Sequence, residues 1–455
     1  MSLAEIASIT AGSVHGDPSV AVTGPVVIDS RRAAPGGLFA ALAGERVDGH
    51  DYVAAALEAG AVAVLASRPV PAPHVLVPDV AEALAALARF VVSRLPGLTI
   101  VGITGSSGKT STKDLTGALL ERLGPTVAPE GSFNNELGLP LTVLRADEST
   151  RYLVLEMSAR GVGHIAWLCD VARPSIGAVL NVGQAHVGEF GSLEGVAKAK
   201  GELVEALPAS GVAVLNAGDP RVMAMADRTS ARIVTFGDSG DVRAEDVWLD
   251  ELARPSFTLR MPSGSAPVRM LVHGAHHVSN ALAAAAIAAE LGLPVADIAE
   301  GLSEVTARSK RRMELHRRGD NVLVINDAYN ANPDSVRAAI DALAHLAASG
   351  RGFAVLGGMA ELGASTEASH LEAGKLAARA GLAGVIAVGS DARPVASGAA
   401  AEPGWDGEAI WVPDNGSAIE QLRSRLRPGD VVLVKASRVA ALWEIADALL
   451  EEVTG

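Results

Sequence analysis

Short apolar runs alternate with helical stretches along most of this chain, and they fall into three successive blocks. The first block spans about residues 26–92 and contains two predicted strands and two predicted helices. The strands are expected at 61–65 and 75–77, and the helices at 51–58 and 80–92. Leu95-Pro96-Gly97 follows, and proline with glycine interrupts regular structure. The block is therefore predicted to be a small α/β domain.

The second block repeats the alternation with more strands. Strands are expected at 99–104, 152–157, 176–181, 212–216 and 233–236, separated mostly by helical stretches. Strands that alternate with helices predict a doubly wound, largely parallel sheet. Residues 241–272 differ, because polar residues, proline and glycine interrupt their short apolar runs, which indicates appended antiparallel strands. A helix is expected at 278–291.

The third block begins near Ser309 and alternates again. Strands are expected at 322–326, 353–356, 385–388 and 431–434, and helices at 335–348, 366–380 and 439–450. This pattern predicts a Rossmann-like domain. A length of 455 residues also accommodates several domains of ~100–200 residues each. The chain is thus expected to be an α/β protein with three domains, at 1–97, 98–308 and 309–455.

Composition and charge narrow the functional classes. The chain has 49% hydrophobic and 20% charged residues, which is typical of compact globular domains. Its 52 acidic and 38 basic residues give a net charge of −14, which disfavours binding to nucleic acid or anionic lipid. Cys169 is the single cysteine, so no intrachain disulfide can form and a reducing compartment is expected.

The sequence predicts no targeting or membrane-spanning segment. Residues 1–5 carry no basic region, and no apolar run approaches the ~18 residues that cross a bilayer. A cytoplasmic protein without membrane insertion is therefore expected, with a monomer as the default.

The strongest chemical signal is Thr104-Gly105-Ser106-Ser107-Gly108-Lys109-Thr110, between a predicted strand and a helical stretch. Glycines at 105 and 108 let the backbone turn and present its N–H groups to a polyphosphate at the helix N-terminus. Lys109 is expected to reach the β- and γ-phosphates, and Thr110 a magnesium ion. Ile103 stands where the common P-loop has glycine, so the loop is of the shorter Gly-x-x-Gly-Lys-Thr type. The order of these features favours a nucleotide site over an ordinary strand-to-helix turn.

Two further polar residues follow strands of the same predicted sheet. Glu156 ends the apolar run that begins at Tyr152, and a carboxylate in that place holds magnesium beside a P-loop. The P-loop favours this role over that of a solvated acid at a strand end. His186 follows the strand at 176–181, where ligands gather in such sheets. A hydrogen-bonded structural histidine is an equally good interpretation of His186.

Several turn-rich segments are candidates for ligand contact. The loop at 134–140 is long enough to reach over the phosphates, although an ordinary surface turn is also consistent with its sequence. In the third block, Arg312 and the segments at 327–333, 357–363 and 435–438 lie at or beside strand ends. They predict a second ligand-facing edge.

These motifs together resemble the Mur ligase family of ATP-dependent amide-bond-forming enzymes, in particular its D-alanyl-D-alanine-adding branch. The resemblance runs from about Asp29 to Arg438. It rests on motifs that occur in order, at 104–110, 133–140, 327–335, 357–363 and 434–438. Gly358 and Ala436 replace the acid and the glycine that are usual in the family.

The resemblance implies amide synthesis in two steps. ATP phosphorylates the terminal carboxylate of a UDP-N-acetylmuramoyl-tripeptide, and D-alanyl-D-alanine then attacks the acyl phosphate. It further implies a UDP-sugar-peptide-binding N-terminal domain, a central ATP-binding domain and a C-terminal domain for the incoming dipeptide. ATP and two magnesium ions are the implied cofactors.

The resemblance also assigns residues to these roles. The implied catalytic residues are Lys109, Glu156, His186 and Lys200. The implied ATP-binding residues are Gly105, Ser106, Ser107, Gly108, Lys109, Thr110, Asn280, Arg312 and Asp327. The implied magnesium ligands are Thr110, Glu156, His186 and a carbamylated Lys200. The implied substrate-binding residues are Ser30, Arg31, Asn134, Asn135, Tyr329, Asn330, Asn332 and Lys435.

Two of these assignments come from the resemblance alone. Lys200 needs carbamylation, because a carbamate offers an anionic oxygen to a hard metal and an ammonium does not. Spacing by itself favours a solvated helix lysine, whereas the match to the family favours Lys200 over Lys198. Asn280 corresponds to the family's adenine contact, and His277 stands where many relatives have asparagine.

Other functions remain as alternatives. A Mur ligase that adds the third residue, or a folylpolyglutamate-type ligase, is disfavoured because the turn at 327–333 replaces the motif by which third-residue ligases bind their amino acid. A nucleotide-gated switch is disfavoured because it needs no second metal site. An oxidoreductase is disfavoured because no Gly-x-Gly-x-x-Gly follows a strand of the third block.

Overall fold

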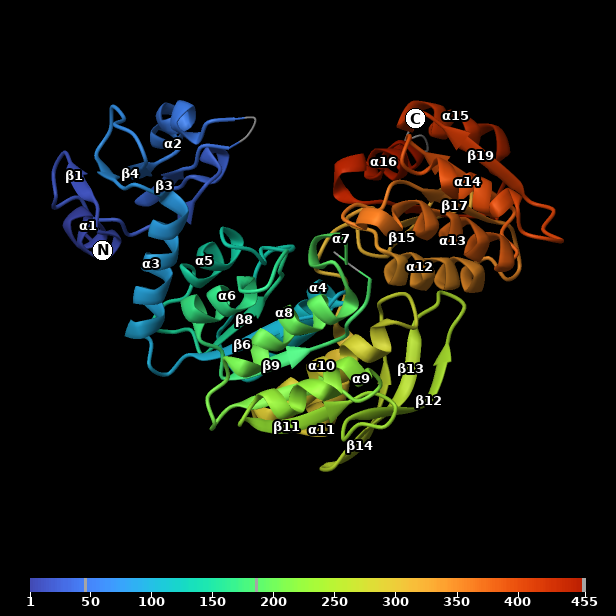
Figure 1. Ribbon diagram of the computed structural model, residues 1–455, viewed down its shortest axis with the longest axis horizontal. Helices are drawn as coiled ribbons and strands as arrows, with labels where there is room; N and C mark the ends of the chain where they lie inside the picture. Colours follow the sequence, from blue (N-terminus) through green and yellow to red (C-terminus); the bar gives the residue numbers. More distant parts are fainter. Residues whose placement is uncertain (45–46, 185–186, 452–455) are drawn as a thin grey trace.

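The computed structural model describes residues 1–44, 47–184 and 187–451. The chain folds into three α/β domains, as the hydrophobic pattern predicts. Figure 1 shows the blue N-terminal domain and the red C-terminal domain at opposite ends of the molecule, with the central domain joining them. No helix among the described residues has the length and apolar character needed to cross a membrane.

The N-terminal domain is built on a five-stranded sheet of order β1-β5-β4-β3-β2. Its strands are parallel except for β1, which pairs with β5 in the antiparallel sense. Its elements are α1 (Leu3–Thr10), β1 (Ser13–His15), β2 (Val26–Val27), η1 (Ser30–Arg32), β3 (Gly37–Ala41), η2 (Gly49–Tyr52), α2 (Val53–Glu58), β4 (Ala61–Ala66), β5 (His74–Leu76) and α3 (Val80–Arg94).

Helix α3 joins the first two domains through its two apolar faces. Asp79 caps its N-terminus by accepting hydrogen bonds from the backbone N–H groups of residues 81 and 82. Leu84 and Leu87 belong to the core of the N-terminal domain. Ala85 and Ala88, on the other side, belong to a core cluster of the central domain. The two domains therefore share one helix rather than a flexible connection.

The central domain contains a six-stranded sheet of order β11-β10-β9-β6-β8-β7, in which all neighbours are parallel. Its elements are β6 (Thr99–Thr104), α4 (Lys109–Glu121), β7 (Thr126–Val127), α5 (Gly138–Val143), β8 (Tyr152–Glu156), α6 (His164–Ala172), β9 (Ile176–Val179), α7 (Val187–Phe190), α8 (Leu193–Glu205), β10 (Val212–Asn216), α9 (Pro220–Met223), η3 (Ala224–Arg228) and β11 (Arg232–Phe236). The strands expected at 99–104 and 212–216 are found with those bounds.

An antiparallel sheet and two helices complete the central domain. The predicted antiparallel segment forms β12 (Arg243–Leu249), β13 (Pro255–Met261) and β14 (Gly264–Arg269). The chain continues through α10 (His277–Glu290) and α11 (Val295–Glu304). Buried alanines at 281 and 283–286 leave α10 narrow, which lets it pack closely against the helix that follows the P-loop.

The C-terminal domain has a six-stranded sheet of order β15-β16-β20-β17-β18-β19, parallel except for the edge strand β15. Its elements are β15 (Glu314–Arg317), β16 (Leu323–Asn326), α12 (Pro333–Leu346), β17 (Gly352–Leu356), η4 (Gly363–Ser365), α13 (Thr366–Arg379), β18 (Gly384–Val388), α14 (Arg393–Ala400), β19 (Glu408–Val412), α15 (Asn415–Arg425), β20 (Val431–Lys435), η5 (Arg438–Ala440) and α16 (Trp443–Glu451).

The pattern missed the buried interior strand β3, two edge strands of the C-terminal sheet and one helix start. The strands β15 and β19 were not predicted, because both lie at sheet edges and are only partly buried. The prediction that the last helix starts at Val439 was wrong, since α16 starts at Trp443. A 3-10 turn precedes it, and Ala441 has a left-handed backbone that ends this turn. Arg438, the first residue of this turn, lines a pocket between the domains.

Backbone contacts join the central and C-terminal domains away from the P-loop. At the β12–β13 turn, the backbone carbonyl of Asp250 bonds His345 Nε2 at 2.8 Å, and Ala253 is buried in the C-terminal core. At α7, the backbone N–H of Gly188 donates to the carbonyl of Glu361 at 3.2 Å. A Cβ at Gly188 would lie 2.4 Å from the backbone nitrogen of Gly363, so only glycine permits this approach.

We expect Gly188→Ala to separate α7 from η4, because the added methyl group overlaps backbone that cannot move aside. Hydrogen exchange in peptides covering 187–190 and 361–365 should accelerate about tenfold, equivalent to about 1.4 kcal/mol of local stability. Gly416→Ala is the matched control, since a Cβ there meets nothing closer than 3.5 Å. Unchanged exchange in both peptides would show that this contact does not hold the two domains together.

Candidate functional site

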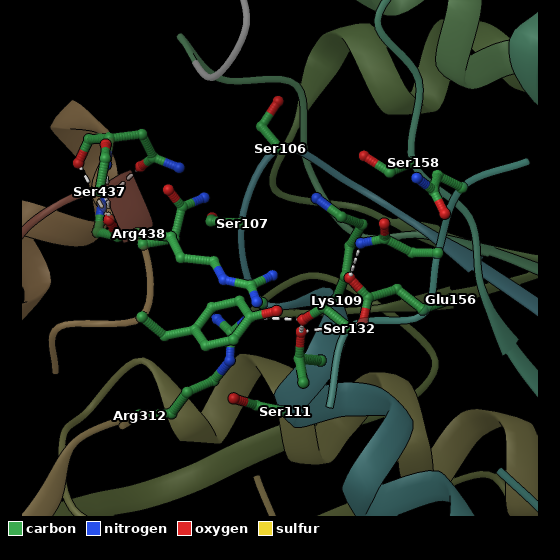
Figure 2. A pocket seen from close by; sticks show the side chains of 18 of the residues that line it. Ser106, Ser107, Lys109, Ser111, Ser132, Glu156, Ser158, Arg312, Ser437 and Arg438 are labelled. Carbon is green, nitrogen blue, oxygen red and sulfur yellow. Dashed lines mark hydrogen bonds between the residues drawn. The ribbon is translucent and has the colours of Figure 1, made fainter. Parts of the chain in front are cut away.

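One cavity of about 730 Å³ is lined by residues from all three domains. Ile28 contributes from the N-terminal domain, the P-loop and Glu156 from the central domain, and Arg438 from the C-terminal domain. Figure 2 shows Arg312 and Arg438 on one side of this pocket and Glu156 and Ser158 on the other, with Lys109 between them. The carboxyl ends of the central parallel strands open toward it, as expected for a doubly wound sheet.

The P-loop has the predicted strand–loop–helix context. It follows β6, and Gly108 caps α4 with a left-handed backbone (φ 79°). A Cβ at Gly108 would lie 2.4 Å from Asn280 Oδ1, so the loop and the start of α10 require a glycine here. Lys109 Nζ donates to the carbonyl of Gly105 at 2.7 Å. Burial lowers the pKa of Lys109, an effect that the Glu156 carboxylate opposes and the Arg312 charge reinforces.

Asn181 shapes the P-loop, and it was not among the predicted site residues. Its Oδ1 accepts hydrogen bonds from the backbone N–H groups of Ser106 and Ser107, each at 2.9 Å. Ser106 Oγ in turn accepts from the N–H of Gly183 at 2.8 Å. The loop after β9 therefore holds the P-loop, and the place of Asn181 at a strand end was the signal that could have identified it.

A run of hydrogen bonds, here called the polar run, crosses the site from the C-terminal domain to the β8 carboxylate. Arg312 Nη2 donates to Ser132 Oγ at 2.8 Å, and Ser132 Oγ lies 2.9 Å from Thr110 Oγ1. Thr110 Oγ1 donates to Glu156 Oε2 at 2.9 Å, and Asn134 Nδ2 donates to Glu156 Oε1 at 2.7 Å. The structure thus brings together the predicted residues Thr110, Glu156, Asn134 and Arg312, and adds Ser132.

The polar run fits a magnesium site. Thr110 and Glu156 are 2% and 1% exposed, and both present oxygen atoms, which magnesium prefers over nitrogen or sulfur. Magnesium keeps several waters and takes one or two protein ligands beside substrate phosphates, so this pair suffices. No cluster of three or more His, Cys, Asp or Glu side chains suited to a metal occurs within residues 1–44, 47–184 and 187–451. His186, the predicted ligand of a second magnesium, lies outside the described residues.

Lys200 and Lys198 differ sharply in environment. Lys200 is on α8 and is 2% exposed, whereas Lys198 is exposed to solvent. Burial lowers the pKa of Lys200 well below its ordinary value, and the nearby charge of Lys109 lowers it further. A neutral amine is therefore accessible at Lys200, and a neutral amine is the form that reacts with carbon dioxide.

Buried polar groups surround the N-terminus of α10. Asn280 is 7% exposed, its Oδ1 lies 3.4 Å from Thr112 Oγ1, and its Nδ2 has no hydrogen-bond partner among the described residues. His276 and His277 stack in a tilted pair with ring centroids 4.3 Å apart, and neither Nδ1 has a partner in the described chain. Burial lowers the pKa of both rings, to about 4 for His276, so both are neutral at pH 7. These groups can satisfy a polar ligand beside the P-loop.

The C-terminal edge of the pocket is organised by a buried ion pair. Lys435 Nζ bonds the Asp327 carboxylate and also donates to the carbonyl of Asn330 at 3.0 Å. Asp327 Oδ1 accepts from the backbone N–H of Met313 at 3.2 Å, which connects β16 to the segment that carries Arg312. Asn332 caps α12 through a hydrogen bond from the N–H of Ser335 at 2.9 Å. The side-chain oxygen of Asn332 therefore already accepts a hydrogen bond within the protein.

The remaining predicted substrate residues have mixed environments. Asn135 lines the pocket, and its Oδ1 accepts from the N–H of Gly138 at the start of α5. Ser30 is 9% exposed. Arg31 is solvent-exposed and forms an ion pair of 2.7 Å with Asp29. Asp29 itself caps η1 through the N–H of Arg31. A UDP contact by Arg31 thus requires exchange of this ion pair.

Comparison with protein families gives matches along most of the chain. Residues 25–91 match the Mur ligase family catalytic domain, residues 103–288 the Mur ligase middle domain, and residues 311–438 the Mur ligase glutamate ligase domain. The UDP-N-acetylmuramoyl-tripeptide–D-alanyl-D-alanine ligase of Mycobacterium tuberculosis is 50% identical over 100% of this chain and 98% of that protein. The ligase of the same name from Escherichia coli K12 is 37% identical over 94% of each chain.

Solved structures give the same result for the fold. A crystal structure of MurF from Acinetobacter baumannii has a TM-score of 0.87 at 31% identity, covering 99% of this chain and 98% of that one. The MurF ligase of Thermotoga maritima in complex with ADP has a TM-score of 0.81 at 30% identity, covering 95% and 98% of the two chains.

Glu156→Gln should weaken magnesium-dependent binding of a nucleoside triphosphate, because the amide keeps the size of the side chain but loses the charge that attracts the metal. We expect the dissociation constant of a fluorescent ATP analogue to rise at least about tenfold with magnesium and little in EDTA. Glu148→Gln, an exposed acid in the same domain, is the control. Equal weakening with and without magnesium would contradict a metal-ligating role.

Proposed function

This chain belongs to the Mur ligase family, and on that premise we propose that it joins D-alanyl-D-alanine to UDP-N-acetylmuramoyl-tripeptide at the expense of ATP. The products are the UDP-N-acetylmuramoyl-pentapeptide, ADP and phosphate. Relatives that bear this activity in their names match the chain over its whole length, at 50% identity in the case of Mycobacterium tuberculosis. The reaction belongs to the synthesis of peptidoglycan precursors.

The observation that carries the proposal is that one pocket combines a P-loop with cations from another domain. The reaction begins when a carboxylate oxygen of the tripeptide attacks the γ-phosphorus of ATP and displaces ADP. The dipeptide amine then attacks the resulting acyl phosphate, an amide bond forms, and phosphate and a proton leave. The tripeptide carboxylate, the ATP phosphates and the carboxylate-bearing dipeptide must approach one another. Positive charge around these anionic groups is therefore the main requirement. Lys109 and Arg312 both line the pocket and would supply this positive charge.

The first magnesium would bind at the polar run. Thr110 and Glu156 would hold it, and it would neutralise charge that develops on the ATP phosphates. Arg312 reaches the same run through Ser132, so docking of the C-terminal domain completes the site. Such an arrangement keeps the acyl phosphate from water until the amine arrives.

A second magnesium would need Lys200 in its carbamylated form, together with His186. The neutral Lys200 amine adds to carbon dioxide, a C–N bond forms, and one proton is released. The product carries an anionic oxygen, which attracts the Lys109 charge, whereas a Lys200 ammonium would be repelled by it. Burial of Lys200 supports this proposal, because it favours the neutral amine over the ammonium.

The three domains would divide the substrates among them. We assign residues 1–97 to the UDP-sugar peptide, with Ser30 and Arg31 as contacts, residues 98–308 to ATP, and residues 309–455 to the dipeptide. Asn280 would bind the adenine, and Asp327 would contribute to ATP binding. The peptide contacts would come from Asn134, Asn135, Tyr329, Asn330, Asn332 and Lys435. We propose a cytoplasmic monomer that binds no nucleic acid.

Phosphate release from ATP should require both substrates. We expect the purified protein to release phosphate only when a UDP-N-acetylmuramoyl-tripeptide and D-alanyl-D-alanine are present together, and mass spectrometry should detect the pentapeptide. Tripeptides ending in lysine and in diaminopimelate, assayed side by side, identify the preferred third residue. Phosphate release with glutamate or a diamino acid, and none with the dipeptide, would contradict the proposed function.

Lys200→Ala should lower turnover at least about 100-fold, because the second metal loses its carbamate ligand. Small carboxylic acids such as acetate should restore part of the activity by supplying an oxygen in the vacated space. Lys198→Ala, at an exposed position two residues away, should leave turnover unchanged. Full turnover of Lys200→Ala without added acid would refute the carbamate.

A further inference from the structure

Two guanidinium groups of the C-terminal domain lie against one aromatic ring in the pocket. The Cζ atoms of Arg312 and Arg438 are 4.4 Å and 5.9 Å from the centre of the Tyr329 ring. Both distances are within the range of cation–π attraction. All three residues line the main cavity, and Figure 2 shows the two arginines extending into it from the same side. Tyr329 thus holds two positive charges near each other.

The two arginines differ in what else they bind. Arg312 donates to Ser132 and is therefore tied to the P-loop side of the site. The Arg438 guanidinium has no ion pair and no side-chain hydrogen bond among residues 1–44, 47–184 and 187–451. The nearby Lys435 is already neutralised by Asp327. Arg438 is therefore a cation of the C-terminal edge that is available to a ligand.

The backbone that carries Arg438 is fixed before any ligand binds. Ser437 is 3% exposed, its Oγ accepts from the N–H of Ala360 at 2.8 Å, and its own N–H donates to the carbonyl of Gly358 at 3.0 Å. Arg438 then starts the 3-10 turn that precedes α16. With the backbone held by the β17 loop and the guanidinium against Tyr329, little conformational entropy is lost on binding.

We propose that Arg438 binds the C-terminal carboxylate of the incoming dipeptide, with Tyr329 as the residue that positions it. A guanidinium presents paired N–H donors that match the two oxygens of a carboxylate. This inference rests on the proposed function and adds to it the residue that recognises the acceptor substrate.

The shared Tyr329 ring limits how far apart the two arginines can lie. Because both contact one ring, their guanidinium carbons are no farther apart than the sum of the two ring distances. An extended dipeptide is about 7 Å long. That length lies within this limit, so a carboxylate on Arg438 is compatible with a dipeptide amine near Arg312.

The test compares D-alanyl-D-alanine with its C-terminal amide, which has the same shape but no carboxylate. We expect the wild-type enzyme to prefer the free dipeptide by about 10- to 100-fold in kcat/KM, the range for a hydrogen-bonded charge pair. Arg438→Ala should raise the KM for the dipeptide by a similar factor and bring the preference close to one. The KM values for ATP and the tripeptide should stay unchanged.

Three further variants separate recognition from structure. Arg393→Ala removes a guanidinium that lies 5.4 Å from the ring of Trp411 in the same domain but away from the pocket, so the preference should persist. Arg438→Lys keeps the charge without the paired donors and should be intermediate. Tyr329→Leu should reduce the preference while Arg438 is present, because the guanidinium loses its support.

The outcomes distinguish this inference from the proposed function. A wild-type preference that survives Arg438→Ala unchanged, or a wild-type enzyme that uses the amide as well as the free dipeptide, would overturn the role of Arg438. A rise in the KM for ATP instead of the dipeptide would do the same. Absence of any dipeptide-dependent turnover by the wild-type enzyme would contradict the proposed function itself.

Discussion

The polar run from Arg312 through Ser132, Thr110 and Glu156 to Asn134 is the interaction on which the site depends. A buried carboxylate and hydroxyl are costly unless each finds partners, and here each satisfies the next. The run begins in the C-terminal domain and ends at the central sheet. The bond from Arg312 to Ser132 therefore forms only while the two domains are docked, whereas the other bonds of the run lie within the central domain.

Close backbone approach makes this docking possible. Glycine at 108 admits the Asn280 side chain to the P-loop, and glycine at 188 admits the η4 backbone to α7. The small alanines of α10 serve the same purpose on a larger scale, since they let that helix lie against α4 and place His277 and Asn280 in the pocket beside the P-loop. Small residues therefore allow the segments that carry the polar side chains of the site to lie close together.

The basic side chains of the site differ in how far their surroundings neutralise their positive charge. Asp327 neutralises Lys435, and burial favours the neutral form of Lys200. Arg312 is shared with the polar run, whereas the contact of the Arg438 guanidinium within residues 1–44, 47–184 and 187–451 is with the Tyr329 ring. Lys435, whose charge is neutralised, organises the fold, whereas the guanidinium groups of Arg312 and Arg438 remain available to substrate anions. This gradient suits a ligase that must bring several anions together without binding any of them irreversibly.

The sequence by itself determined the elements that depend on local pattern. Alternating strands and helices predicted the three α/β domains, and the order of strand, glycines, Lys109 and Thr110 predicted the P-loop. The pattern missed the edge strands β15 and β19, and it placed the start of the last helix four residues early. Only the tertiary structure identified Ser132 and Asn181 as parts of the site, and it showed that Arg438, in the predicted ligand-facing segment 435–438, lies against Tyr329. Ser132 and Asn181 act through partners 22 to 180 positions away, as in the bonds of Ser132 with Thr110 and with Arg312. Hydrophobic periodicity records which face of an element is buried, but side-chain chemistry between distant segments depends on how the elements pack, which no local pattern contains.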